Sequence, residues 1–310
     1  MKFIPLGTVI TTMNLSLEKT PLHPSMAAID GYLLVLCDLF EKIDAQRQAT
    51  LTTSEAESLH QLRIAIRRAR SILREGRKVL PTLLAQSMSD DLAWLSSITG
   101  DARDLDTLVD HWPLYERMVE PKEANRLQVV IREVHYRRTD AYREMRAHLN
   151  GQRTITLINE WQVFMLDGTD FGDEGSAAHD ELKDVIAQRL SKAHQQLIKD
   201  CRAINSKSSD DDVHALRKDA KRVRYLAESF SEIFPKKNGD LLLPQLLNLQ
   251  DTLGEFQDLR IHETIIDDAL PYLRPIYTPS TIEATEELLD HMKKRRQKLR
   301  KKVISGILRA

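Results

Sequence analysis

A concentrated run of positive charge lies between Leu59 and Leu80 of the sequence. This segment holds seven Lys or Arg residues and one acid, Glu75, although the whole chain has a formal net charge of −1. Like charges one helical turn apart repel each other, so a helix with a basic face requires an anionic counterpart. Internal carboxylates could supply this counterpart, and so could a polyanionic ligand. Because guanidinium groups donate forked hydrogen bonds to oxyanions, an arginine-rich face favours phosphate groups. At helical spacing, one face of the segment would carry His60, Arg63, Arg67, Arg70 and Arg74.

The same pattern returns 154 positions later in the chain. The offset pairs Pro81 with Pro235 and Gly100 with Gly254 without a gap. Eleven of the 46 positions from 60 to 105 are identical to their partners, and one register held over that length indicates an internal repeat. The second basic stripe comprises His214, Arg217, Lys221 and Arg224.

A basic stripe on a helix is, taken alone, most often a solvated face, and a histidine beside an apolar seam is more often packed than ligand-binding. The repeat favours a different interpretation. Both copies keep the histidine and two arginines of the stripe, Arg63 with Arg217 and Arg70 with Arg224, whereas exposed neighbours differ, as at Gln61 and Ala215. We therefore interpret the two stripes as halves of one anion site.

Each stripe runs beside the apolar seam of an amphipathic helix. Two boxes of the form [ST]-x-x-[DE], Ser54 with Glu57 and Ser208 with Asp211, predict where these helices begin. The prolines paired by the repeat are expected to end them, since proline cannot continue the hydrogen-bond ladder. The seams consist of Leu59, Leu62, Ile66, Ala69 and Leu73, and of Val213, Leu216, Ala220, Val223 and Ala227.

Few helix-breaking residues interrupt the rest of the chain. Gly and Pro number 11 each, and no segment shows a convincing strand pattern, so the predicted fold class is all-α. Gly100 and Gly254 are expected to cap the ends of helices. Besides the two striped helices, helical patterns are expected at residues 26–48, 82–99, 104–119, 122–149, 154–164, 180–204, 240–253, 258–270 and 280–308.

Glycines, acids and a serine near residues 167–178 interrupt the helical periodicity and divide the chain. We expect a leader of unknown role at 1–25, a first helical half at 26–166, a linker at 167–178 and a second half at 179–310. The two cysteines are not spaced like a disulfide scaffold or a metal clip. With no signal peptide and no long apolar stretch, the sequence predicts a soluble, cytoplasmic protein.

The repeated motif His-x-x-Arg-(x)3-Arg-Arg-x-Arg, with Gly-x-x-Arg-Asp-Leu-Asp at Gly100, resembles the CHAD family, the conserved histidine α-helical domain, over about residues 26–310. The resemblance implies two helical-bundle repeats, related by a pseudo-twofold axis around a basic cavity that binds inorganic polyphosphate. The second copy departs from the first at Gln257, in place of Arg103, and at Arg260, in place of Asp106. The motif positions are His60, Arg63, Arg67, Arg68, Arg70, Arg103, His214, Arg217, Lys221, Arg222 and Arg224; Arg74 and three lysines of the C-terminal basic run, Lys294, Lys298 and Lys301, are expected to join them.

The expected activity is binding without turnover, in the cytoplasm and at polyphosphate granules. No P-loop, zinc signature or nucleophile elbow accompanies the stripes, so we expect neither a metal nor a cofactor, and the leader does not match the triphosphatase domain of many relatives. A nucleic-acid binder is one alternative, although few aromatic residues are available to stack on bases. The other is a metal-dependent phosphohydrolase using the two motif histidines with Asp104 or Asp258, but the surrounding arginines oppose metal binding.

Overall fold

The computed structural model of the protein describes residues 21–53, 55–167, 175–234 and 243–307. These residues are helical and form no strand, apart from an isolated bridge between Ala27 and Glu181, so the expected all-α class is confirmed for them. None of the described helices is long and apolar enough to cross a membrane. In chain order the helices are α2 (Ala28–Thr52), α3 (Ala56–Glu75), η1 (Gly76–Lys78), α4 (Thr82–Ile98), α5 (Gly100–Glu116), α6 (Pro121–Arg126), α7 (Gln128–Leu149), α8 (Gln152–Asp167), α9 (Leu182–Ala203), α10 (Asp210–Ser229), η2 (Ser231–Ile233), α11 (Leu243–Asp267), α12 (Leu270–Leu273) and α13 (Pro279–Ile307).

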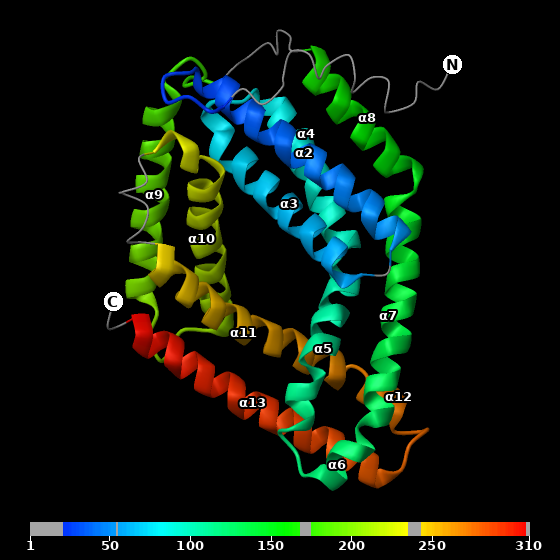
Figure 1. The fold of residues 1–310 in the computed structure, drawn as a ribbon. Coiled ribbons are helices and arrows are strands. Elements are labelled where there is room, and N and C mark those ends of the chain that lie inside the picture. The colour runs from blue at the N-terminus through cyan, green and yellow to red at the C-terminus, as the bar shows by residue number, and fades with distance from the viewer. Residues whose placement is uncertain (1–20, 54, 168–174, 235–242, 308–310) are drawn as a thin grey trace.

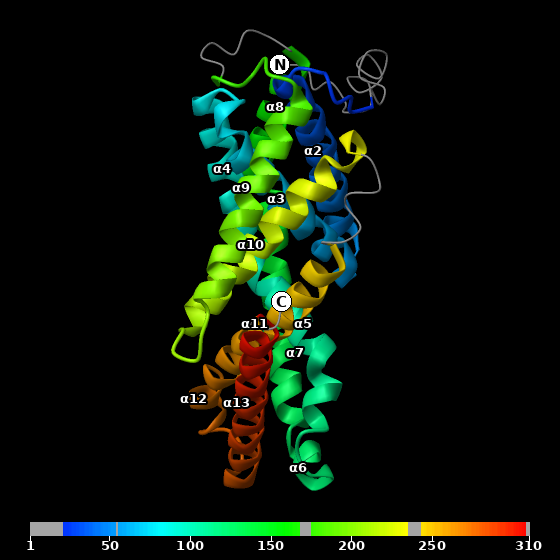
Figure 2. The ribbon, with the colours of Figure 1, turned by 90° about the vertical axis from the view of Figure 1, so that its left-hand side faces the viewer.

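Four antiparallel helix pairs form the sides of a frame (Figure 1). The pairs are α2 with α3, α9 with α10, α11 with α13, and α5 with α7. At the corners α3 contacts α10 and α5, and α11 contacts α10 and α5, so these four helices are the inner members of the pairs. A view from the side shows that the frame is long and narrow (Figure 2).

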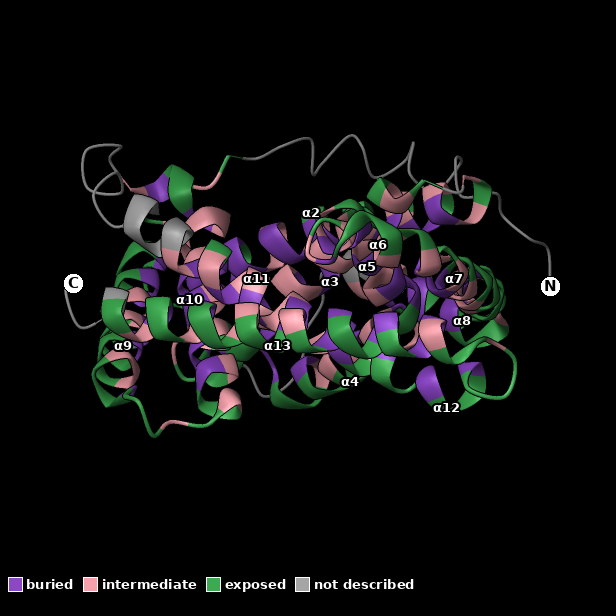
Figure 3. Cartoon of the chain, turned by 90° about the horizontal axis from the view of Figure 1, so that it is seen from below, coloured by how far each residue is buried: buried purple, intermediate pink, exposed green. Residues whose placement is uncertain are grey.

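Two hydrophobic cores hold the frame together. One includes Leu36, Leu62 and Trp161 together with Ile186 of α9 and Phe230, which directly precedes η2. The other is built around α5, α7, α11 and α13 and also receives residues of α9 and α10. Buried positions lie on the helix faces that meet other helices, and exposed positions lie on the outer faces (Figure 3). Each core thus unites segments from both sides of residues 167–178, and the division of the chain into two halves stays a prediction.

The repeat is visible in the lengths of the striped helices. Helices α3 and α10 each have 20 residues, and their bounds are offset by the same 154 positions as the motif. All five residues of the first apolar seam are buried, and so are the second seam's residues except Ala227, which is half-buried. The periodicity therefore identified the core faces of both helices correctly.

Some predicted helix ends were wrong by a few residues. The capping box of α10 uses Ser209 and Asp212, one residue after the predicted pair, because Ser209 Oγ accepts from the Asp212 amide at 3.1 Å. The predicted cap of α3 at position 54 lies outside the described residues. Pro81 does not end α3, which stops at Glu75, but instead precedes α4.

Neither repeated glycine ends a helix. Gly100 is the first residue of α5, and α11 runs through Gly254, so the patterns 240–253 and 258–270 belong largely to one helix. A glycine inside a helix costs about 1 kcal/mol relative to alanine, which packing of α11 against α10, α5 and α13 can offset. The pattern 122–149, by contrast, is two helices that meet at Leu127.

Candidate anion-binding site

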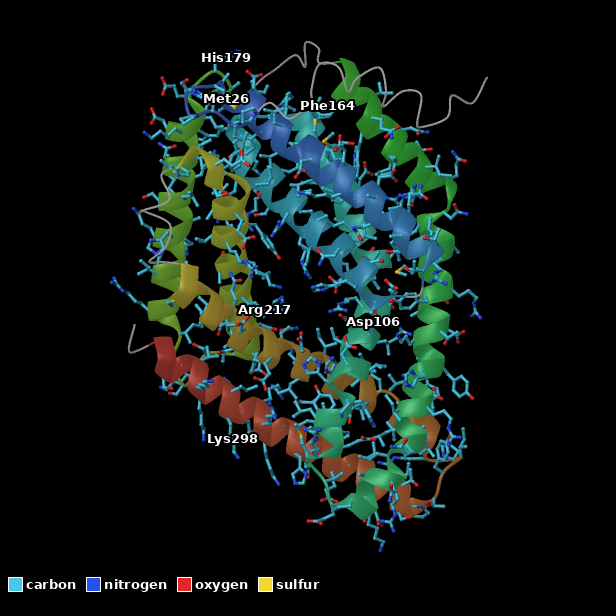
Figure 4. All side chains as sticks on the ribbon, viewed as in Figure 1. Met26, Asp106, Phe164, His179, Arg217 and Lys298 are labelled. Atoms are coloured by element: carbon cyan, nitrogen blue, oxygen red, sulfur yellow. The ribbon has the colours of Figure 1, made fainter. Side chains whose placement is uncertain are left out.

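The two basic stripes lie on α3 and α10, which contact each other at one corner of the frame. Seven cations on these helices are half-buried. We call four of them, which form no ion pair in the described residues, the basic cluster: Arg63, Arg67, Arg217 and Lys221. The charge of Arg67 acts on each of the other three, so the cluster joins both copies of the repeat. Figure 4 shows Arg217 on the inner side of the frame, where α10 meets α11.

The basic cluster holds hydrogen-bond donors that no group of the described residues satisfies. The Nε atoms of Arg63, Arg67 and Arg217 are buried without a partner, as is Nδ1 of the adjacent His60. Within the described part of the chain, no carboxylate lies within ion-pair distance of the four cations. Of the four, Arg63 alone has side-chain hydrogen bonds to described residues, which run over 2.9 Å from Nη1 to the Ser96 carbonyl and to the Thr99 hydroxyl. Buried donors of this kind are costly unless an acceptor reaches them, so the arrangement suits an external oxyanion.

Burial and mutual repulsion reduce the proton affinity of these groups. Burial, followed by the charges of Arg217 and Arg67, lowers the pKa of the Lys221 ammonium to about 6. Burial and then the charge of Arg67 lower the pKa of Arg63 to about 10. Nearby Asp258 opposes the shift at Lys221, but it does not compensate for the burial. At pH 7.5 the ligand-free Lys221 is therefore mostly neutral, and an anion beside it would restore its charge.

The two motif histidines have different neighbours. Burial and then the charge of Arg103 lower the pKa of His60. Burial also lowers the pKa of His214, although its hydrogen bond to Gln257, with 2.9 Å between Nδ1 and Oε1, opposes the shift. The structure thus places Arg103 beside His60 and gives the equivalent place beside His214 to a neutral amide. The two ends of the site are chemically unequal.

Three other motif arginines are paired with carboxylates. Arg222 of α10 donates from Nε and Nη2 to Glu75 of α3, and Nη2 lies 3.0 Å from Oε2. Arg68 and Arg224 donate to opposite oxygens of Glu228, each over 2.6 Å. The contacts of Arg222 and Arg68 connect α3 with α10, so the motif divides into cations without an ion pair in the described residues and cations paired with carboxylates.

Comparison with known proteins places this arrangement in a family. The family model of the CHAD domain matches residues 35–267. The chain belongs to the CHAD family. Two solved structures share its fold: the CHAD domain from the plant Ricinus communis, at 24% identity and a TM-score of 0.76 over 92% of this chain and 93% of that one, and PptA from Streptomyces chartreusis, at 15% identity and a TM-score of 0.69 over 92% and 100%. No curated protein matches the chain.

The second copy of the internal repeat has Arg260 where the first has Asp106, and the structure explains this difference. Asp106 is buried in the first copy, where it accepts 2.6 Å from Arg138 Nε and 2.7 Å from the Tyr142 hydroxyl of α7. Arg260 instead donates to Asp211 at the start of α10, over 2.8 Å. The two positions therefore fasten α5 and α11 to different neighbours.

The structure does not bring every predicted site residue into the basic cluster. Arg70 and Arg74 are exposed on α3, and Lys294, Lys298 and Lys301 are exposed on α13. Figure 4 shows Lys298 pointing away from the inner helices. The half-buried arginines of α13 form ion pairs with acids of α10 and α11: Arg295 with Glu255, and Arg296 with Asp210 and Glu263.

The lysines of α13 are expected to contribute little to ligand affinity. Exchange of Lys294, Lys298 and Lys301 for Gln should weaken anion binding by less than about threefold at 0.15 M salt, because exposed charges further away than about 8 Å are screened. Titration at 0.15 M and at 0.03 M salt would check this. A tenfold loss at the higher salt would place the α13 face inside the site.

An acidic groove bounds the cluster near His214. Its volume is about 730 Å³, and Gln257 and Arg260 also line it. Because acids outnumber bases on its walls, the groove repels anions and limits the site on this side. The acids are Asp101, Asp104, Asp140, Glu144, Asp211 and Asp268.

Sequence reasoning missed the acids that govern the motif. Glu228 follows Arg224 by one helical turn, a spacing that could have indicated the pair. Glu75 was visible only as the single acid of the basic run, and nothing in the sequence gave its partner Arg222. The sequence pattern favoured Asp104 and Asp258 as charges near the start of a helix, with a metal site as the alternative, and did not indicate that they lie beside the basic cluster. No group of three or more His, Cys, Asp or Glu suited to a metal occurs among the described residues.

Proposed function

We propose that the protein binds inorganic polyphosphate at the basic cluster between α3 and α10. One observation carries the proposal: half-buried cations from both copies of the repeat lie together, and the buried Nε atoms of Arg63, Arg67 and Arg217 have no acceptor among the described residues. Guanidinium groups form short, charge-assisted hydrogen bonds to phosphate oxygens. Membership of the CHAD family supports the same ligand, since resemblance to that family implies binding of inorganic polyphosphate.

A chain of phosphates fits the cluster better than one phosphate does. Arg63 and Arg67 are one helical turn apart on α3, and Arg217 and Lys221 are one turn apart on α10, which spaces the charges about 5.4 Å apart along each helix. A linear polyanion presents successive charges to such rows, whereas a single phosphate could contact only some of them. The proposal includes a pseudo-twofold relation between the rows and a basic cavity between them.

The proposed activity is binding and not hydrolysis, since the cations lack the nucleophile or general base that phosphoryl transfer would need. We further propose that the protein works in the cytoplasm, where binding would bring it to polyphosphate granules. Competition between polyphosphate and single-stranded RNA distinguishes this function from nucleic-acid binding.

Titration with long-chain polyphosphate at 0.15 M salt is expected to show saturable binding. Single-stranded RNA at equal phosphate concentration is expected to compete at least about tenfold less well, because little stacking is available to bases and stacking supplies about 1–3 kcal/mol per base. Absence of binding to polyphosphate would refute the proposal. Equal competition by RNA would favour a general backbone binder, and phosphate release with stoichiometric metal would favour a hydrolase.

A further inference from the structure

The carboxylate of Glu228 bridges the two copies of the repeat. Its Oε2 accepts from Arg68 Nη2 of α3 and its Oε1 accepts from Arg224 Nε of α10, both over 2.6 Å. One planar anion thus occupies two guanidinium groups at once. A phosphate group would make the same kind of bridge, since its oxygens accept from guanidinium groups in a similar way.

The neighbours of Glu228 keep both arginines in place around the carboxylate. Arg224 Nη1 donates over 3.1 Å to Gln250, whose own amide donates to the Ala220 carbonyl over 2.7 Å. The Arg68 guanidinium lies over the Tyr225 ring, 5.8 Å from its centre. Removal of the carboxylate would therefore leave two oriented cations.

Glu228 borders the basic cluster and remains accessible to solvent. The charge of Arg224 acts on Lys221, so the bridged pair continues the row of cations on α10. The Glu228 side chain is 25% exposed, whereas the Glu75 side chain, which holds Arg222, is 1% exposed. A ligand can reach the first carboxylate, but the second is enclosed in the fold.

We propose that Glu228 is an internal competitor of the ligand: its carboxylate occupies a phosphate subsite formed by Arg68 and Arg224, and a bound polyphosphate chain displaces it. This inference rests on the proposed function and adds a regulatory element to the same site. A weak or short anion cannot recover the lost ion pairs, whereas a long chain already held by the basic cluster presents its next phosphate at high local concentration. Glu228 therefore raises the minimum length of chain that binds well.

Exchange of Glu228 for Gln tests the competition because it removes the charge and keeps the shape. The variant is expected to bind tripolyphosphate about three- to tenfold more tightly than the wild type, as expected for release of two partly exposed ion pairs, and long-chain polyphosphate by a smaller factor. The magnitude of the salt slope should rise by roughly 0.7 for each arginine released. A residue that only supported the fold would produce weaker binding instead.

Glu232→Gln is the matched control, since it removes one exposed negative charge four residues further along the chain. It should leave both affinities within about twofold of the wild type. Should Glu228→Gln lower the melting temperature, Glu228→Ala must show the same sign of affinity change at a temperature where both variants are folded. Unchanged or weaker binding by the Glu228 variants, with normal binding by the wild type, would overturn the inference alone; a wild type that binds no polyphosphate would overturn the proposed function.

Discussion

The double variant Arg67→Gln/Lys221→Met is expected to lose at least about 100-fold in affinity for polyphosphate. It removes one unpaired cation from each copy of the repeat, and each hydrogen bond to a charged group contributes about 1.5–3 kcal/mol. Two such contacts correspond to roughly two to four powers of ten in the dissociation constant. The salt slope should fall by roughly 1.4, on the scale of about 0.7 per contact that applies to single strands. Titration calorimetry at three salt concentrations measures both quantities.

The same variant should be more stable than the wild type without ligand. Arg67 and Lys221 are half-buried and lack an ion pair in the described structure. Removal of Arg67 relieves its repulsion with Arg63 and Arg217, and removal of Lys221, which is mostly neutral without ligand, relieves the burial of an unpaired amine. Each kcal/mol gained raises the melting temperature of a chain this large by about 2–4 °C. The control Arg143→Gln/Lys192→Met removes the same charges from exposed positions and should change neither property. Equal losses in both double variants would indicate diffuse attraction and no defined site.

The amphipathic pattern predicted the striped helices because the spacing of apolar residues along a helix determines which face is buried. Leu62 and Leu216 occupy the same register in both copies, and both are 1% exposed. The helix ends were less accurate, since a serine cap competes with its neighbours: Ser209 caps α10 although Ser208 has the same spacing to an acid. The prediction that Gly254 ends a helix was wrong for a different reason. Packing of α11 on three helices outweighs the low helix propensity of one glycine.

The motif could not predict which of its basic residues form ion pairs with carboxylates and which do not. Arg67 and Arg68 are adjacent in the sequence, yet Arg67 forms no ion pair in the described residues whereas Nη2 of Arg68 donates to Glu228, 160 positions away. Which arginine is neutralised depends on how α3 crosses α10, and that is a property of the tertiary structure. The lysines of α13 could not be placed from the sequence either. The helix was predicted correctly, but Lys294, Lys298 and Lys301 are exposed on its outer face.

Protonation of Lys221 is expected to couple ligand affinity to pH. Its pKa of about 6 in the free protein should rise when phosphate oxygens lie beside it, so the complex binds more protons than the free protein. Affinity must then increase as the pH falls from 8.5 to 6, by up to about tenfold per pH unit, and level off below 6 once the free lysine is charged. The pKa values of His60 and His214 are also lowered, so any contribution from the histidines comes at the acidic end of this range.

Stability without ligand should have the opposite pH dependence in the same window. An unfolded chain holds the Lys221 proton up to about pH 10.4, whereas the folded protein releases it near pH 6, so this group makes the protein more stable as the pH rises between these values. Lys221→Met should remove this dependence, and melting curves from pH 6 to 9 would show its loss.

The decisive variant for the pH coupling is Lys221→Arg, because a guanidinium group keeps its charge throughout this range. It should bind polyphosphate at pH 8.5 at least as tightly as the wild type and lose most of the dependence on pH. Calorimetry in two buffers of different ionisation enthalpy should show uptake of nearly one proton per bound site by the wild type at pH 7.5, and much less by the variant. Equal proton uptake by both proteins would assign the coupling to other groups, the histidines first, and would leave Lys221 as a permanently charged contact.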